Sequence, residues 1–164
     1  MSSYGHNLLS WLRDAHAMEE QAEQLFIGQA KGFKDYGQLS LQLETEARDS
    51  IEHQKLLSIR IQQLGSDISI LKDAAAKLVA ASQNISGVVM SDEPVKGILS
   101  LYTFTHMGIG SYLILVAAAE AASDAETSRL CLEILNQYKA RAIWLEKYLH
   151  DVTELFLYRS AAAA

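Results

Sequence analysis

The chain has little of several residue types that would narrow its function. It contains one cysteine, Cys131, which excludes an intrachain disulfide and a cysteine-based zinc site within this sequence. Its single proline permits long uninterrupted helices. The 14 basic residues are outnumbered by 20 acidic ones, the net charge is −6, and no run of lysine or arginine occurs. A nucleic-acid partner is therefore not expected, because phosphate binding needs a basic surface.

Long apolar segments are also missing. The longest apolar run, Tyr112–Ala119, is far shorter than the roughly 20 residues that span a bilayer. The first residues, MSSYGHNLLSW, lack the basic segment and apolar core of a signal peptide. We therefore expect a cytoplasmic protein without a membrane partner. With 164 residues, 49% of them hydrophobic, the chain can form one domain with a real core, expected over residues 1–159 and followed by a loose tail, 160–164.

Four long segments carry apolar residues at alternating steps of four and three. This spacing is typical of amphipathic helices that pack against other helices, and no strand alternation is present. The spacing predicts helices near residues 8–32, 36–64, 93–122 and 124–157. Capping boxes are expected where the second and fourth helices begin, from Asp35 with Gln38 and from Ser123 with Glu126.

The connection between the second and third helices is too long for a tight hairpin. It contains apolar residues spaced as in a short amphipathic helix, from Leu71 to Ile85. Long crossovers occur in bundles whose successive long helices run parallel. The sequence therefore predicts an all-α, ferritin-like four-helix bundle with a long crossover that carries a short extra helix.

Each predicted helix carries its least apolar inward residues near its midpoint. In an antiparallel bundle the midpoints meet, so these residues are expected to share one layer. An unpartnered buried polar group costs about 1–3 kcal/mol, so the layer must supply its own partners or hold a metal. The predicted polar layer consists of Glu19, Glu46, Asp49, His53, Tyr138 and Arg141.

Arg141 distinguishes a metal site from an internal ion pair. It follows Tyr138 by three places, where a metal-binding helix of this type would carry a histidine. A guanidinium keeps its charge, so it would neutralise Glu19 and Glu46 and repel a divalent cation. We predict that Arg141 points into the bundle and bonds one of these glutamates. His53 and Tyr138 are expected to complete the network, with no metal bound. His16 and His150 are expected on the surface.

Several segments resemble the YciE/YciF-like branch of the ferritin-like superfamily, and the resemblance covers almost the whole chain. The segments are LRDAHAMEEQAEQ (12–24), IQQLG (61–65), YTFTHMGIGSY (102–112) and SYLILVAAAEAASDAE (111–126). The resemblance implies a bacterial protein associated with stress responses. It also implies dimers of four-helix bundles that are similar to di-iron carboxylate proteins. Such sites take one glutamate from each of two helices and a Glu-x-x-His motif from each of the other two.

The ligand pattern implied by the resemblance is only partly present. Glu19 matches the acidic position of the first helix, but Asp49 and His53 are four places apart, and Ser50 stands three before His53. The family's acidic positions on the third and fourth helices are occupied by Thr105, Gly108, Gln137, Tyr138 and Lys139. Iron and manganese prefer carboxylate and imidazole ligands, so two helices lack suitable ones.

Two functions remain open. The first is a stress-associated ferritin-like protein with a degenerate di-metal site, acting as a dimeric binding or structural module without a cofactor and not as an enzyme. The alternative is an oxidoreductase or iron-handling protein of the di-iron or di-manganese type, with Glu19, Asp49 and His53 as metal ligands. An interaction module whose partner docks on Ile68–Val89 is compatible with the first. The expected homodimer rests on the small residues of the third helix and the apolar residues of the crossover.

Overall fold

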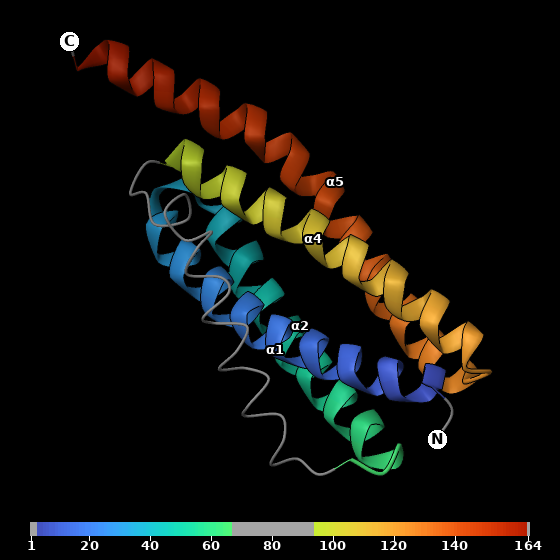
Figure 1. Ribbon diagram of the computed structural model, residues 1–164. Helices are drawn as coiled ribbons and strands as arrows, with labels where there is room; N and C mark the ends of the chain where they lie inside the picture. The colour runs from blue at the N-terminus through green and yellow to red at the C-terminus, as the bar shows by residue number, and fades with distance from the viewer. Residues whose placement is uncertain (1–2, 67–93, 164) are drawn as a thin grey trace.

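The computed structural model describes residues 3–66 and 94–163, and this part of the chain is all-α (Figure 1). It contains no strand in these residues. Its elements are α1 (Ser3–Gly32), the 3-10 helix η1 (Lys34–Tyr36), α2 (Gln38–Gln63), α4 (Pro94–Ala121) and α5 (Ala125–Ala162). The predicted four long helices are confirmed. The short helix predicted between Leu71 and Ile85 lies outside the described residues.

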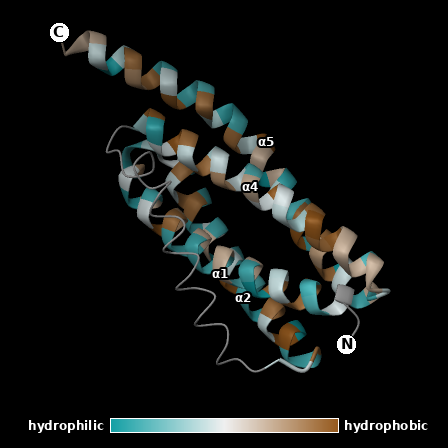
Figure 2. Cartoon of the chain, in the orientation of Figure 1, coloured by the Kyte–Doolittle hydropathy of each residue, from teal (hydrophilic) through white to brown (hydrophobic). Residues whose placement is uncertain are grey.

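The helices form two hairpins that pack into a ferritin-like bundle. Helix α1 packs along α2, and α4 packs along α5, each pair joined by a short turn. The hairpins then meet through α1 with α4 and through α2 with α5 (Figure 1). Every helix carries both apolar and polar residues, the composition expected of amphipathic helices around a shared core (Figure 2).

The core consists of two apolar clusters with polar residues between them. One cluster is built around Leu12, Leu57 and Ile134, and the other around Phe26, Leu43 and Ile98. A group of buried polar side chains falls between these clusters, with members on all four helices: Glu19, Glu46, Ser50, His53, Thr105 and Arg141. His16, Ser100, Thr127 and Ser128 are also buried but are not part of this group. The bundle therefore has one polar layer across its centre.

The ends of the helices differ from the predicted caps. Gly37 precedes α2 with φ +47° and gives no side-chain cap, while Asp35 lies within η1. At the α4–α5 turn, Asp124 caps α5 by accepting from the Thr127 N–H. Ser123 cannot take that role because it adopts the left-handed conformation (φ +57°) that ends α4.

Helix α5 continues to Ala162, beyond the predicted end at residue 157 and into the segment expected as a loose tail from residue 160. The residues after Arg159 are a serine and alanines, and they are exposed. Alanine has the highest intrinsic helix propensity, which favours continuation of the helix even without packing.

Helix α4 has an unusually apolar outer surface. No aspartate, glutamate, lysine or arginine occurs between Lys96 and Glu120. Its exposed large side chains are Leu99, Met107, Leu113 and Ile114. By length and composition alone, Pro94–Ala121 could cross a membrane, and it is the one such helix among the described residues. Its inner side chains, such as Tyr112 and Leu115, are buried in the bundle.

Candidate functional site

Glu19 lies at the middle of α1 and is fully buried. Two phenols donate hydrogen bonds to its Oε1 atom: the Tyr112 hydroxyl at 2.6 Å and the Tyr138 hydroxyl at 2.9 Å. The two rings lie 5.3 Å apart between centroids. Burial, and next the charge of Glu19, raises the pKa of both tyrosines well above the ordinary value. Both phenols therefore keep their protons and act as donors.

His53 contacts the other oxygen of Glu19. Its Nδ1 lies 3.2 Å from Glu19 Oε2, as an electrostatic pair without good hydrogen-bond geometry, and its Nε2 lies 2.8 Å from Gln137 Oε1. Burial opposes the charge on the imidazole, but the interaction with Glu19 outweighs it, so the pKa of His53 is raised. Both ring nitrogens face acceptors, which is the arrangement an imidazolium satisfies.

Arg141 enters the same layer from α5 and pairs with Glu46. Its Nε donates to Glu46 Oε2 at 2.6 Å, and the Arg141 side chain is fully buried. The other oxygen of Glu46 accepts from Trp144 Nε1 and Gln42 Nε2, each at 3.2 Å. Burial opposes the guanidinium charge, yet the surrounding groups, Tyr138 and Glu46 foremost, raise the pKa of Arg141. The arginine is therefore a permanent buried cation.

The Arg141 guanidinium lies between two aromatic rings. Its central carbon is 4.5 Å from the ring centroid of Phe26 and 4.3 Å from that of Tyr138. The contact with Tyr138 links the Glu46–Arg141 pair to the Glu19–His53 pair. The two Nη atoms of Arg141 have no hydrogen-bond partner among the described residues. The same holds for the hydroxyl groups of Ser50 and Thr105. The layer is thus held by charge pairing and stacking as much as by hydrogen bonds.

Asp49 is placed differently from the other predicted members of the layer. It is half-buried and makes no hydrogen bond or ion pair within the described part of the chain. Burial, and then the charge of Glu46, raises its pKa. Asp49 therefore lies at the edge of the layer, while Glu19, Glu46, His53, Tyr138 and Arg141 form its interior.

The ring of Tyr138 fills the space beside Gly108 on α4. A Cβ atom at Gly108 would come 2.0 Å from Tyr138 Cε1. A side chain at position 108 and the observed Tyr138 ring therefore exclude each other. Within the described residues, no group of three or more histidine, cysteine, aspartate or glutamate side chains is arranged to hold a metal ion.

Several partners in the layer were missed by sequence reasoning. Trp144 and Gln42 both donate to Glu46, and Gln137 accepts from His53. Helical spacing was the available signal, because Gln42 lies four places before Glu46 and Trp144 three after Arg141.

His16, expected on the surface, is buried, and burial lowers its pKa. It lies where α1 meets α2, beside Ile51 and Gln54. His16 follows Ala15, an inward-facing residue of α1, and lies on the side of α1 that meets α2. Sequence spacing does not show how much of the α1 surface the neighbouring helix α2 buries.

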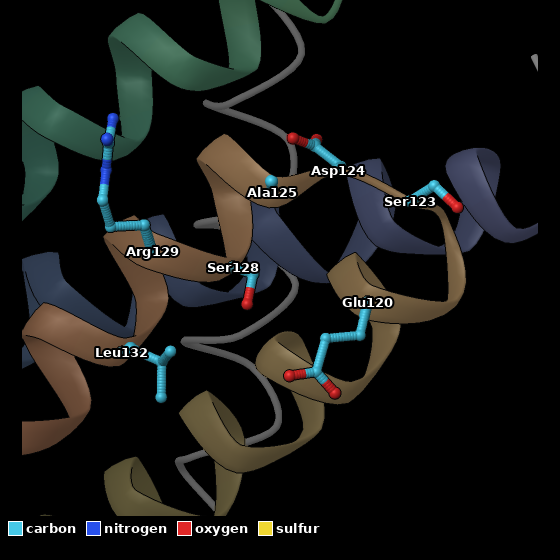
Figure 3. A pocket seen from close by; sticks show the side chains of 7 residues that line it. All are labelled: Glu120, Ser123, Asp124, Ala125, Ser128, Arg129 and Leu132. Atoms are coloured by element: carbon cyan, nitrogen blue, oxygen red, sulfur yellow. The ribbon is translucent and has the colours of Figure 1, made fainter.

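Helices α2 and α5 are also joined beyond the layer, at the α4–α5 turn. Arg60 on α2 donates to Asp124, Thr127 and Glu126, each at 2.7 Å. The α2–α5 edge therefore has polar contacts at three heights: at Arg60, at His53 and at Glu46. A hollow on the outside of the same turn is lined by Glu120, Ser128, Arg129 and Leu132, among others, and includes no member of the polar layer (Figure 3).

Four long helices around a buried polar layer define a ferritin-like helical bundle. The bacterioferritin of Desulfovibrio desulfuricans, described with a di-iron site, shares this fold with a TM-score of 0.70 and 18% identity, over 98% of this chain and 88% of that one. A protein from Xanthomonas campestris pv. campestris matches with a TM-score of 0.80 and 25% identity, over 98% of this chain and 99% of that one. Residues 4–158 match the family described as a domain of unknown function (DUF892), and the chain belongs to that family.

Proposed function

We propose that this chain is a stress-associated member of the YciE/YciF-like branch in which an internal ion pair has replaced the di-metal centre. In this proposal it acts in the cytoplasm as a homodimeric binding or structural module, without a cofactor and without enzyme activity. The observation that carries the proposal is the buried Arg141 guanidinium, bonded at 2.6 Å to the carboxylate of Glu46.

The charges of the layer support this reading. Glu19 and Glu46 are the two glutamates inside it, and His53 and Arg141 are the cations that face them. A divalent metal placed beside Arg141 would be repelled by a charge that cannot be removed by deprotonation. The phenols of Tyr112 and Tyr138 also occupy an oxygen of Glu19 that a metal would need. We infer that the donor set does not fit a two-metal centre.

The outer face of α4 supports a second copy of the chain as the partner. Leu99, Met107, Leu113 and Ile114 are all exposed on a helix segment without acidic or basic residues. Contiguous exposed apolar surface of this kind marks interfaces. Light scattering at micromolar concentration is expected to give the mass of a dimer. Leu113→Glu should shift it to a monomer, while Leu157→Glu, at an exposed position on α5, should not.

Metal analysis tests the internal ion pair. Protein purified without affinity-column metal or chelator is expected to contain far less than one iron or manganese ion per chain and to take up none on titration. Arg141→His removes the fixed charge and adds a ligand, so it should gain affinity for Fe(II) or Mn(II). Lys139→His, exposed on the same helix and without an acidic residue three or four places away, is the matched control and should not.

The alternative function, a metal-dependent oxidoreductase or iron-handling protein, is supported by the 3.2 Å contact between Glu19 and His53, because both residue types bind iron. The metal analysis described above distinguishes the two functions. Binding of one or two metal ions per chain to the wild type, abolished in Glu19→Gln, would replace the ion-pair proposal with a metal-dependent oxidoreductase or iron-handling protein.

A further inference from the structure

Two buried tyrosines share one carboxylate oxygen at the centre of the bundle. Tyr112 and Tyr138 are both 0% exposed, and their hydroxyls lie 2.6 and 2.9 Å from Glu19 Oε1. A carboxylate oxygen has two lone pairs, so it can accept from both phenols at once. The arrangement gives each phenol an immediate base within hydrogen-bond distance.

The carboxylate is in turn connected toward the surface. Glu19 Oε2 contacts His53 Nδ1 at 3.2 Å, and His53 Nε2 lies 2.8 Å from Gln137 Oε1. Gln137 is an exposed residue of α5. A series of polar contacts therefore runs from the two buried phenols through Glu19 and His53 to an exposed residue.

We propose that Tyr112, which shares the Glu19 carboxylate with Tyr138, is a redox-active tyrosine that is oxidised by radical oxidants such as peroxyl radicals. A phenol that loses an electron becomes a strong acid, so its proton must leave in the same event. Here the Tyr112 O–H bond breaks, the proton goes to Glu19, and the electron goes to the peroxyl radical. The resulting peroxide anion takes a proton from solvent and leaves as a hydroperoxide. The products are a neutral phenoxyl radical and protonated Glu19.

The surroundings assign the radical to Tyr112. The Arg141 cation lies 4.3 Å over the Tyr138 ring, which makes removal of an electron from that ring unfavourable. In the part of the chain that the structure describes, no cation stacks on the ring of Tyr112. Tyr112 also has the shorter bond to Glu19. Tyr138 then acts as a positioning residue, whose hydroxyl holds Glu19 in place.

A thiolate can reduce the oxidised Tyr112. It gives one electron to the phenoxyl radical and becomes a thiyl radical, while the proton on Glu19 returns to the Tyr112 oxygen. The oxidant and the thiol both work from the surface. An α-helix is only about 10 Å across, so electrons need to cross little more than one helix to reach the layer.

The test is flash photo-oxidation of the full chain, incubated with chelator, by tris-bipyridine ruthenium and persulfate, followed by electron paramagnetic resonance. A phenoxyl signal is expected that decays at least tenfold more slowly than that of free tyrosine under the same conditions. It should vanish in Tyr112→Phe and persist, with faster decay, in Tyr138→Phe. It should be unchanged in Tyr158→Phe, which alters a tyrosine that is 75% exposed.

Glu19→Gln tests the base, because an amide cannot take the proton; the signal should fall several-fold. If that variant does not fold, the wild type still decides, since its radical formation must slow in deuterium oxide. A signal that decays like free tyrosine, survives in Tyr112→Phe or is lost in Tyr158→Phe would overturn the proposal. Chelator treatment separates this result from the metal question, because any bound iron is removed before the flash.

Discussion

The ring of Tyr138 rests on the backbone of Gly108, where α5 crosses the middle of α4. A Cβ atom at position 108 would meet Tyr138 Cε1 at 2.0 Å. Glycine inside a helix costs roughly 0.5–1 kcal/mol relative to alanine, so the contact must offset that cost. The close approach also sets the depth at which the Tyr138 hydroxyl reaches Glu19.

Gly108→Ala is therefore expected to destabilise the protein by about 1–3 kcal/mol, because the buried ring has to move away from its partner. Gly110 lies two places further along α4, and a Cβ there meets nothing within 4 Å. Gly110→Ala should be neutral or stabilise by up to about 1 kcal/mol through helix propensity. Urea unfolding of both variants measures the contrast, and equal effects would contradict the close contact.

Arg141→Ala is expected to lower the free energy of unfolding by about 3–5 kcal/mol, because it leaves the Glu46 carboxylate buried without its cation. The Arg141 side chain is fully buried, whereas Lys147 on the same helix is 75% exposed. Lys147→Ala should therefore change stability by less than about 0.5 kcal/mol. Denaturant unfolding at pH 7 measures the free energy of unfolding of both variants. A loss below about 1 kcal/mol for Arg141→Ala would mean that the pair is not a buried one.

His53 predicts a specific dependence of stability on pH. Its pKa is raised in the folded protein above the ordinary 6.5, so the folded state holds the proton more tightly than the unfolded state. The stabilisation is fully present below pH 6.5 and is lost as the pH rises through the raised value. The free energy of unfolding should therefore fall on going from pH 6.5 upward, and this fall should be reduced in His53→Gln.

His16 has the opposite effect on the pH dependence of stability, and in a lower pH range. Its pKa is lowered in the folded protein, so it reduces stability as the pH falls through 6.5 and below, and it has little effect above that value. Measurements in a His16→Asn background remove this contribution. An unchanged pH profile in His53→Gln, measured in that background above pH 6.5, would show that folding does not raise the pKa of His53.

Ser123→Gly is expected to stabilise the protein. Ser123 ends α4 with φ +57°, and the N–H groups of Ser123 and Asp124 bond back to Glu120 and Ala119. A non-glycine residue in the left-handed region costs roughly 1–2 kcal/mol, which glycine avoids. Ser123→Ala keeps the Cβ atom and should give no gain. Thermal unfolding distinguishes the two, and a gain in both variants would assign the effect to the hydroxyl instead.

The midpoints of the predicted helices placed several polar side chains at one height, because antiparallel helices in a bundle meet near their centres. Spacing put Arg141 at the height of both Glu19 and Glu46, and the structure pairs it with Glu46. Spacing gives the position of a residue along the bundle axis. It says little about how each neighbouring helix is rotated about its own axis. Trp144 and Gln42, the other donors to Glu46, were therefore missed. For the same reason Asp49 was expected in the layer and lies at its edge.

The turns were predicted less well than the helices. Ser123 and Asp124 are both good capping residues, and the sequence does not show which one adopts the left-handed conformation. Asp35 likewise belongs to a 3-10 helix that a capping pattern does not reveal. These choices depend on how the chain must close a short connection between two packed helices. That geometry is set by the tertiary structure.

The polar contacts along the α2–α5 edge have a consequence for how the two hairpins are aligned. Apolar side chains on packed helices form repeating ridges, so one helix can slide past another by a turn of 5.4 Å and find similar contacts. Arg60 donates to Thr127 at 2.7 Å, His53 lies 2.8 Å from Gln137, and Glu46 accepts from Arg141 at 2.6 Å; all three partners are on α5. A slide of one turn would break all three, since a hydrogen bond is lost beyond about 3.5 Å. Because each of the three residues has its own partner, they admit a single register, and the α1–α2 hairpin can meet the α4–α5 hairpin in only one alignment.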